Sequence, residues 1–136
     1  MKLSVITLTY NKLEYTKKFI ESLYKYTKDF ELIIVDNGST DGTVEYLKSL
    51  KDVKLILNNE NKGFSAGNNQ GTELAEGEYI GFLNNDILLY PEWFEACEDV
   101  FKIEKAAFIS PRHINPHYDC LLYTSPSPRD RQKSRM

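Results

Sequence analysis

The chain alternates short apolar runs with longer amphipathic stretches, and this alternation predicts the order of its elements. Four runs have the length and β-branched content of strands: residues 3–8, 32–35, 53–57 and 79–83. A fifth strand is expected over residues 106–109. Strands that alternate with helical stretches predict an α/β fold, in which a mostly parallel sheet carries helices on both faces.

The helical stretches carry apolar residues at helical spacing and recognisable start signals. One stretch places Thr16, Phe19, Ile20, Leu23 and Tyr24 on one face. Asn11, with Glu14 three residues later, has the form of an N-cap with its partner carboxylate. Pro91 is well placed to open the last helix.

Three glycines recur at intervals of four within a polar stretch. Gly63, Gly67 and Gly71 would lie along one face of a helix. Glycine is a poor helix former, so a functional or packing reason is expected. The spacing predicts that this helix approaches the sheet or a ligand closely.

The run 79–83 leads directly into the polar residues that are the main candidates for a binding site. Its uninterrupted apolar character predicts a strand buried on both faces, and it ends in Asn84, Asn85 and Asp86. Carboxylate and amide oxygens at a strand end can bind a hard divalent cation. A turn or a helix cap is the alternative interpretation, because Asn and Asp readily bond nearby backbone.

Two other strands are also followed by polar residues. Thr9, Tyr10 and Asn11 follow the first strand, and Asp36 follows the second. Carboxyl ends of parallel strands meet at one edge of a sheet, where ligands collect in open α/β folds. The three polar groups together therefore predict a binding site at that edge.

Composition and charge narrow the class of protein. The 136 residues leave room for one domain, and a hydrophobic fraction of 41% supplies a core. The net charge is -3, although residues 120–136 are basic, so the rest of the chain is acidic. An acidic body argues against a nucleic-acid partner. The two cysteines lack metal-ligand spacing and no apolar stretch could span a membrane, so a soluble, cytoplasmic chain is expected.

The character of the sequence changes near residue 119. Residues 119–136 lack amphipathic periodicity and predict a disordered tail that resembles translated vector sequence. A native basic tail that binds nucleic acid or anionic lipid is the competing interpretation. We therefore expect a folded domain over residues 1–118 and a non-native tail over 119–136.

Four sequence blocks together resemble the nucleotide-sugar-binding half of glycosyltransferase family 2, notably its rhamnosyltransferase-like members. The blocks are residues 4–11, 34–43, 61–69 and 77–86. The resemblance implies the GT-A fold, which is Rossmann-like, incomplete here at its C-terminal side.

The resemblance also implies roles for individual residues. Base and ribose would be bound by Thr9, Tyr10, Asn11 and Asp36, with Asp41 expected to cap the following helix. Lys62, Asn68, Asn84 and Asn85 would contact the diphosphate or sugar of a UDP-, dTDP- or GDP-linked donor. For Asp36, capping of its own turn is the alternative; for Lys62 and Asn68, ordinary exposed positions are.

Asp86 stands at the last position of the family's DxD-type motif, which implies a Mg2+ or Mn2+ ion between carboxylate and diphosphate. Asn84 replaces the first carboxylate of that motif, so weaker metal affinity is expected. The ion would act as a Lewis acid on the leaving diphosphate.

The family inverts configuration with a carboxylate base that lies beyond this half. The chain departs from the pattern after His113, and lone histidines such as His113 and His117 are poor substitutes. The catalytic base is therefore expected to be absent, and the chain is expected to bind a donor without transferring sugar to a glycan or lipid-linked acceptor. Many relatives work at the cytoplasmic face of a membrane, which implies peripheral membrane association.

Two other function classes remain open on the residues alone. A non-catalytic nucleotide-binding module would carry the same donor residues. A receiver-type signalling domain shares the parallel sheet, but it needs paired acids after the first strand, and none is present. A P-loop NTPase is excluded because the GxxxxGK[ST] pattern is absent.

Overall fold

The computed structural model describes residues 2–111 and divides into two units, residues 1–96 and 97–136. The first unit holds a four-stranded sheet in the order β3-β2-β1-β4. Its strands are β1 (Leu3–Thr9), β2 (Phe30–Asp36), β3 (Val53–Leu57) and β4 (Tyr79–Phe82). Every neighbouring pair is parallel. The α/β class and the parallel sheet predicted from the sequence are thereby confirmed.

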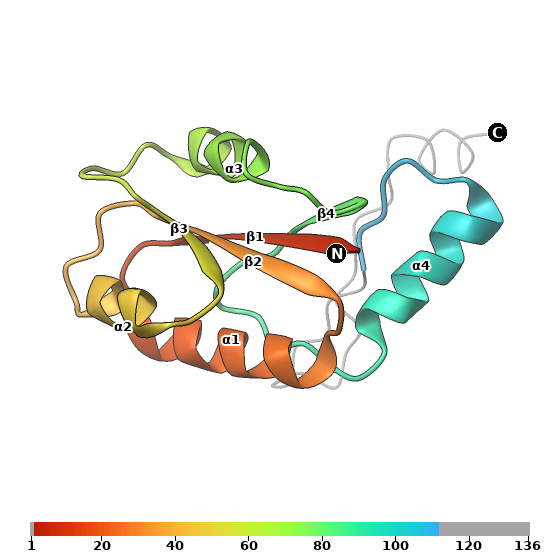
Figure 1. Cartoon of the computed structure of the whole chain (residues 1–136), viewed down its shortest axis with the longest axis horizontal. Helices are drawn as coiled ribbons and strands as arrows, with labels where there is room; N and C mark the ends of the chain where they lie inside the picture. The colour runs from red at the N-terminus through yellow and green to blue at the C-terminus, as the bar shows by residue number, and fades with distance from the viewer. Residues whose placement is uncertain (1, 112–136) are drawn as a thin grey trace, which may run out of the picture. The chain divides into compact units, whose positions relative to one another are not determined.

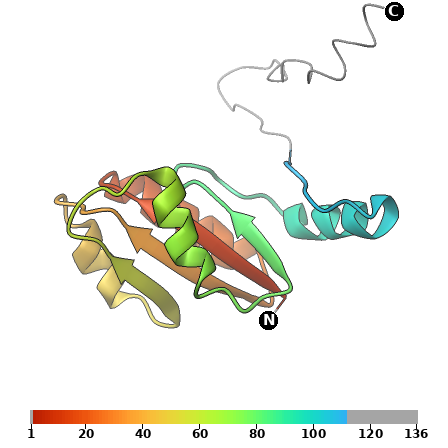
Figure 2. The same ribbon diagram turned by 90° about the horizontal axis from the view of Figure 1, so that it is seen from above.

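The described residues form four helices, of which the first three cover the two faces of this sheet. They are α1 (Leu13–Tyr26), α2 (Thr43–Ser49), α3 (Phe64–Thr72) and α4 (Trp93–Glu104). Helix α3 lies on one face, and α1 and α2 lie on the other (Figures 1 and 2). The boundary between the two units falls within α4, after Ala96. The rest of α4 and an irregular stretch to residue 111 form the described part of the second unit.

The core is built around β1 and β2, the two central strands. Residues 31–36 of β2 are all buried, because this strand has a neighbour on each side and helices over both faces. From α1, Phe19 and Leu23 are fully buried. These are two of the residues whose helical spacing predicted a buried face, whereas Tyr24 at the border of that face is exposed.

Two of the three spaced glycines explain how α3 packs closely against the sheet. A Cβ atom on Gly67 would lie 2.5 Å from Leu8 Cδ2, and one on Gly71 would lie 2.5 Å from Ile6 Cγ2. Such distances are far below van der Waals contact, so a side chain at either position would force Leu8 or Ile6 to shift, and glycine avoids this. Gly63 differs, because it precedes the helix with φ 85° and an added Cβ would meet nothing within 4 Å.

Strand β4 corrects one prediction. The sequence suggested a strand buried on both faces, but β4 is an edge strand paired with β1. Ile80 and Phe82, on the face that α3 covers elsewhere, are 44% and 52% exposed. An apolar run reports that a strand is hydrophobic, but its place in the sheet depends on pairing with distant residues.

Other predictions differ in detail or lie outside the described residues. Residues 106–109 form no strand. Helix α4 begins at Trp93, after a turn in which Glu92 has φ 62°, so Pro91 precedes the helix instead of opening it. The predicted tail lies outside the described residues, and so do His113 and His117. Within residues 2–111, no helix is long and apolar enough to cross a membrane.

Candidate functional site

The carboxyl ends of β1 and β2 bring Thr9 and Asp36 side by side. The two residues are register partners, and Thr9 Oγ1 donates to Asp36 Oδ2 at 2.7 Å. Leu8 meets Gly67 of α3, so the next residue, Thr9, and its register partner Asp36 lie on the opposite face of the sheet. They lie at the edge where the sequence predicted a site. The predicted convergence of these two strand ends is therefore observed.

Asp36 is the centre of a hydrogen-bonded loop. Its carboxylate accepts bonds from Thr9 Oγ1, from the N–H groups of Gly38 and Ser39 at 3.1 and 2.9 Å, and from Ser39 Oγ at 2.5 Å. The residue is 0% exposed. This is the turn-capping arrangement that stood as the alternative for Asp36. A contact between Asp36 and a nucleotide stays a prediction.

The loops after β1 and β2 hold one another in place. The N–H of Asn11 donates to Ser39 Oγ at 2.7 Å, and Asn11 Oδ1 accepts the N–H of Thr40 at 2.7 Å. Asn11 and Lys12 both have left-handed backbones, with φ 57° and 59°. The sequence singled out Asn11 but missed Ser39, whose only signal is its place in a loop dense in cap residues.

The cap of α1 corrects a second prediction. The N-cap residue is Lys12, not Asn11, and it makes no side-chain cap bond. The N–H of Leu13 donates instead to Asp41 Oδ2 in the neighbouring loop, at 3.1 Å. Asp41 also accepts bonds from the Oγ1 and N–H of Thr43, and the hydroxyl bond is the main cause that lowers the pKa of Asp41. One carboxylate thus bonds the first turns of two helices.

Tyr10 and Lys62 contribute the exposed side chains near these loops. Tyr10 follows β1 directly and is 53% exposed. Lys62 lies in the exposed loop before α3. An exposed ring is suited to stack on a base. An ammonium group is suited to offset diphosphate charge, as the sequence suggested for Lys62.

A group of amides lies between β2, β3 and α3. Asn58 exchanges hydrogen bonds with Gln70 at 2.8 and 3.0 Å and donates to Asn37 Oδ1 at 3.0 Å. Asn68, which the sequence placed in the donor site, is buried on α3. Sequence reasoning did not select Asn37 and Asn58, although each directly follows a strand.

The DxD-like segment begins where β4 leaves the sheet. The N–H of Leu83 donates to Ile6 O at 3.0 Å, so the chain departs before β1 reaches its end at Thr9. Asn84 and Asp86 are exposed, whereas Asn85 is half-buried and its Nδ2 donates to Thr16 Oγ1 of α1 at 3.0 Å. The middle residue of the segment therefore faces the protein, and its two neighbours face solvent.

The donor set of this turn suits a hard cation only in part. Asp86 and Asn84 offer carboxylate and amide oxygens, which Mg2+ and Mn2+ accept as ligands. Within residues 2–111, however, no group of three or more Asp, Glu, His and Cys side chains could enclose an ion. Mg2+ is commonly held by one or two carboxylates together with substrate phosphates, and the residues present fit that mode.

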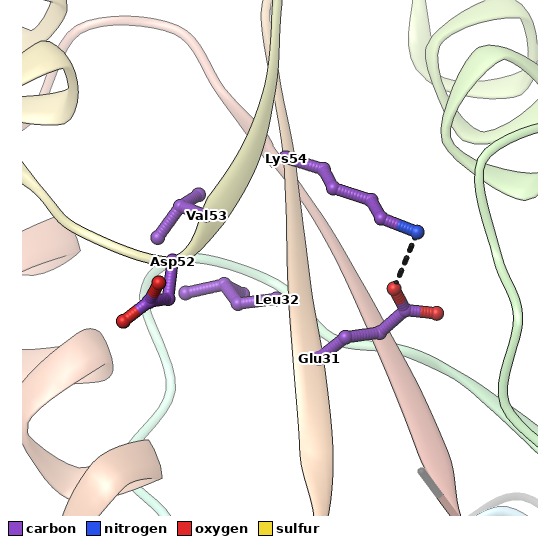
Figure 3. A pocket seen from close by; sticks show the side chains of 5 residues that line it. All are labelled: Glu31, Leu32, Asp52, Val53 and Lys54. Atoms are coloured by element: carbon purple, nitrogen blue, oxygen red, sulfur yellow. Dashed lines mark ion pairs between the residues drawn. The ribbon is translucent and has the colours of Figure 1, made fainter.

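A hollow of about 330 Å³ lies away from these residues, at the amino ends of β2 and β3. It is lined by Glu31, Leu32, Asp52, Val53 and Lys54. Lys54 reaches toward Glu31, with 2.7 Å between Nζ and Oε2, while Asp52, Val53 and Leu32 lie on the other side (Figure 3). Lys54 also donates to Leu74 O and Glu76 Oε2 at 2.9 Å, so this ion pair holds the segment before β4 to the sheet.

The sequence profile described as Glycosyl transferase family 2 matches residues 4–135. The chain belongs to glycosyl transferase family 2. The match runs into residues 119–136, whose foreign origin stays a prediction.

This family 2 chain is similar in sequence to curated glycosyltransferases and similar in fold to solved ones. An uncharacterized glycosyltransferase of Rickettsia felis is 39% identical over 97 residues, which are 69% of this chain and 16% of the relative. The S. aureus TarS fragment 1–349, solved in complex with UDP-GlcNAc, matches with a TM-score of 0.68 and 28% identity, over 75% of this chain and 31% of that one. The chain thus spans less than a third of either protein.

A second solved structure similar to this family 2 chain contains both a donor and a metal. It is the mannosyltransferase PcManGT from Pyrobaculum calidifontis in complex with GDP-Man and Mn2+. It matches with a TM-score of 0.55 and 26% identity, over 64% of this chain and 28% of that one. These neighbours bear out the GT-A fold, of which this chain forms a part.

Proposed function

We propose that this chain binds a nucleoside-diphosphate sugar together with Mg2+ or Mn2+, as the donor half of an inverting glycosyltransferase. The main support is a preformed loop pair around Asp36 and an exposed acidic turn at Asp86, which the bond from Asn85 to Thr16 ties to α1, in a chain of family 2. Neighbours solved with UDP-GlcNAc and with GDP-Man and Mn2+ support the ligand class. UDP-, dTDP- and GDP-linked donors all fit this proposal.

Different residues would bind different parts of the donor. Tyr10 would stack on the base, while Thr9, Asn11 and Asp36 hold the ribose and the base edge, directly or by fixing the loops. Lys62 and Asn68 would meet the phosphates or the sugar. Hydroxyl, amide and carboxylate groups supply the oriented hydrogen bonds that such a ligand needs.

Asp86 would hold the ion, with Asn84 as a neutral second ligand. When bound, the ion would neutralise the charge that develops on the departing nucleoside diphosphate. With one carboxylate in place of two, we expect weaker metal affinity than in relatives that carry two acids. Asn85 has its amide turned to Thr16, so its part is to hold the turn.

Calorimetric titration of the full chain with UDP, dTDP and GDP, each with and without Mn2+, tests this function. We expect one nucleotide to bind, and Mn2+ to tighten its binding about tenfold or more. Asp86→Ala should abolish that gain. Glu78→Ala removes an exposed carboxylate just before β4 and should leave it unchanged. A folded chain that binds none of the three nucleotides would contradict the proposal.

We further propose that the chain alone transfers little or no sugar, because the residues that match the family blocks include no catalytic base. An assay of donor hydrolysis and of transfer to glycan or lipid-linked acceptors decides between a donor half and a competent transferase. Activity that Asp86→Ala removes would overturn this part. Nucleotide binding without any Mn2+ effect would favour the alternative, a non-catalytic nucleotide-binding module.

The cellular place is also a proposal. We propose a cytoplasmic location with peripheral membrane association, as the resemblance to glycosyltransferase family 2 implies. Sedimentation with anionic lipid vesicles tests the association. A chain that stays in the supernatant at low salt would contradict it.

A further inference from the structure

The segment that follows the DxD-like turn is fastened to α1 by a series of hydroxyl groups. Three hydrogen bonds form this series, and their partners advance along both segments in the same direction. In chain order they are Asn85 Nδ2 to Thr16 Oγ1 at 3.0 Å, the N–H of Leu89 to Ser22 Oγ at 3.1 Å, and Trp93 Nε1 to Thr27 Oγ1 at 2.9 Å.

The first of these bonds acts on the acidic turn itself. Thr16 is 0% exposed, and Asn85 is half-buried between two exposed neighbours, Asn84 and Asp86. In an extended or turning chain, anchoring the middle residue inward fixes the direction in which its neighbours point outward. The Thr16 hydroxyl therefore anchors the residue directly before Asp86.

Thr16 also belongs to the structure that carries the other half of the site. It lies in the first turns of α1, and its hydroxyl is 3.5 Å from Lys12 O, at the end of the loop that holds Tyr10 and Asn11. That loop is in turn bonded to Ser39 and Thr40. A continuous set of hydrogen bonds thus joins the loops around Asp36 to the turn of Asp86.

We propose that Thr16 is a positioning residue of the donor site, which holds Asp86 at a fixed place relative to the Tyr10–Asn11 loop through Asn85. The inference rests on the proposed function. The sequence carries a faint signal for it, because Thr16 is the polar member of an otherwise mostly apolar helical face. Its burial alone would suggest a core residue, but its bond to Asn85 links that core to the acidic turn.

The test compares three variants of the full chain by titration with UDP, with and without Mn2+. If UDP does not bind, GDP and dTDP are used in the same way. Thr16→Val removes the acceptor but keeps the shape, Thr16→Ser keeps the hydroxyl, and Ser22→Ala removes the equivalent acceptor at Leu89. We expect Thr16→Val to reduce the Mn2+-dependent gain in affinity about tenfold. Nucleotide affinity without Mn2+ should stay within about twofold, since a lost neutral hydrogen bond far from the base has little effect there.

The control variants separate positioning from general stability. Thr16→Ser should restore the Mn2+ gain to within about twofold of the original chain, and Ser22→Ala should leave it unchanged even where it lowers stability as much. Hydrogen exchange gives a second reading, in which Thr16→Val speeds exchange of the amides at 84–88 but not of those in β1 and β2.

The outcomes distinguish this inference from the function on which it rests. An original chain that binds no nucleotide would overturn the proposed function and this inference with it. An original chain with a Mn2+ gain that survives in Thr16→Val would overturn the positioning role alone. Equal losses in Thr16→Val and Ser22→Ala would also overturn it, because they would report a general loosening of the segment.

Discussion

Strand β2 carries two buried carboxylates, and they are held in different ways. Glu31 lies near the amino end of the strand on the face covered by α3, and Asp36 lies at the carboxyl end on the opposite face. Each accepts hydrogen bonds that fix a neighbouring loop. Glu31 Oε1 accepts from Ser4 Oγ at 2.5 Å and from the N–H of Glu76 at 2.6 Å, which ties the segment before β4 to the sheet.

The two carboxylates differ in what balances their charge. Glu31 forms an ion pair with Lys54, whereas the four groups that donate to Asp36 are all neutral. A buried carboxylate with a paired cation serves the fold. Asp36 is held by neutral donors alone, at the carboxyl ends of β1 and β2, where its bonds fix the neighbouring loop without a paired cation. The comparison therefore assigns a structural role to Glu31 and leaves Asp36 as the residue suited to organise a binding site.

The largest effect is expected from Asp36→Asn. The amide keeps the size of the carboxylate but loses the charge that strengthens its four hydrogen bonds, and its N–H2 group requires the Thr9 and Ser39 hydroxyls to turn and accept. We expect a loss of about 3 kcal/mol in the free energy of unfolding. Urea unfolding followed by circular dichroism measures it, and a loss below that of Glu31→Gln would reverse the comparison.

A smaller effect is expected from Glu31→Gln. The amide oxygen can still accept from Ser4 and from the N–H of Glu76, but the attraction to Lys54 is lost and the amide N–H2 group then faces the Lys54 ammonium group. Because the Lys54 side chain is 36% exposed, solvent weakens that attraction, and we expect a loss of about 1 kcal/mol. The same unfolding experiment at neutral pH measures it. A loss as large as that of Asp36→Asn would show that the ion pair is the stronger anchor.

The pH dependence of stability sharpens the contrast. Burial acts to raise the pKa of Glu31, but hydrogen bonds from Lys54, Ser4 and the N–H of Glu76 outweigh it, and the pKa is lowered. A lowered pKa in the folded state gives stability that is present above the unfolded pKa, about 4.3, and is lost as the pH falls through the folded value. Unfolding curves between pH 6 and about pH 3 should therefore fall more steeply for the original chain than for Glu31→Gln. Parallel curves for the two proteins would contradict a lowered pKa of Glu31 in the folded state.

The smallest effect on stability is expected from Asp86→Ala. This carboxylate is exposed, and the described structure gives it no hydrogen bond or ion pair. We expect a change within about 0.5 kcal/mol in urea unfolding, although the same variant should remove the Mn2+ effect on nucleotide binding. A large loss of stability would mean that Asp86 serves the fold, and the metal proposal would lose its basis.

Much of the fold could be predicted from the sequence, because local periodicity reports local structure. The apolar runs predicted the four observed strands to within two residues at each end. The glycine spacing predicted the close seat of α3, which Gly67 and Gly71 confirm. The fifth strand failed because two of the four apolar residues at 106–109 are alanines, whereas residues 32–35 are of the same length but rich in the β-branched residues that favour strands.

The candidate site was predicted as a place, but not as a set of contacts. Polar residues after parallel strands had to meet at one edge, and Thr9 and Asp36 do so. The hydrogen-bond partners of the site residues could not be predicted. Asp41, for example, accepts from the N–H of Leu13, and Asn85 donates to Thr16, in each case across a long stretch of sequence. Such bonds depend on which loop lies beside which, and no local pattern encodes that.

The sequence by itself determined the order of strands and helices, the membership of the family and the edge at which polar side chains gather. These follow from periodicity, composition and short blocks of residues, which are properties of neighbours along the chain. Only the tertiary structure decided that β4 is an edge strand, that Asn85 turns inward and that Asp36 fixes a loop pair. Those outcomes depend on pairing between segments far apart in the sequence, where burial and hydrogen bonding are settled together.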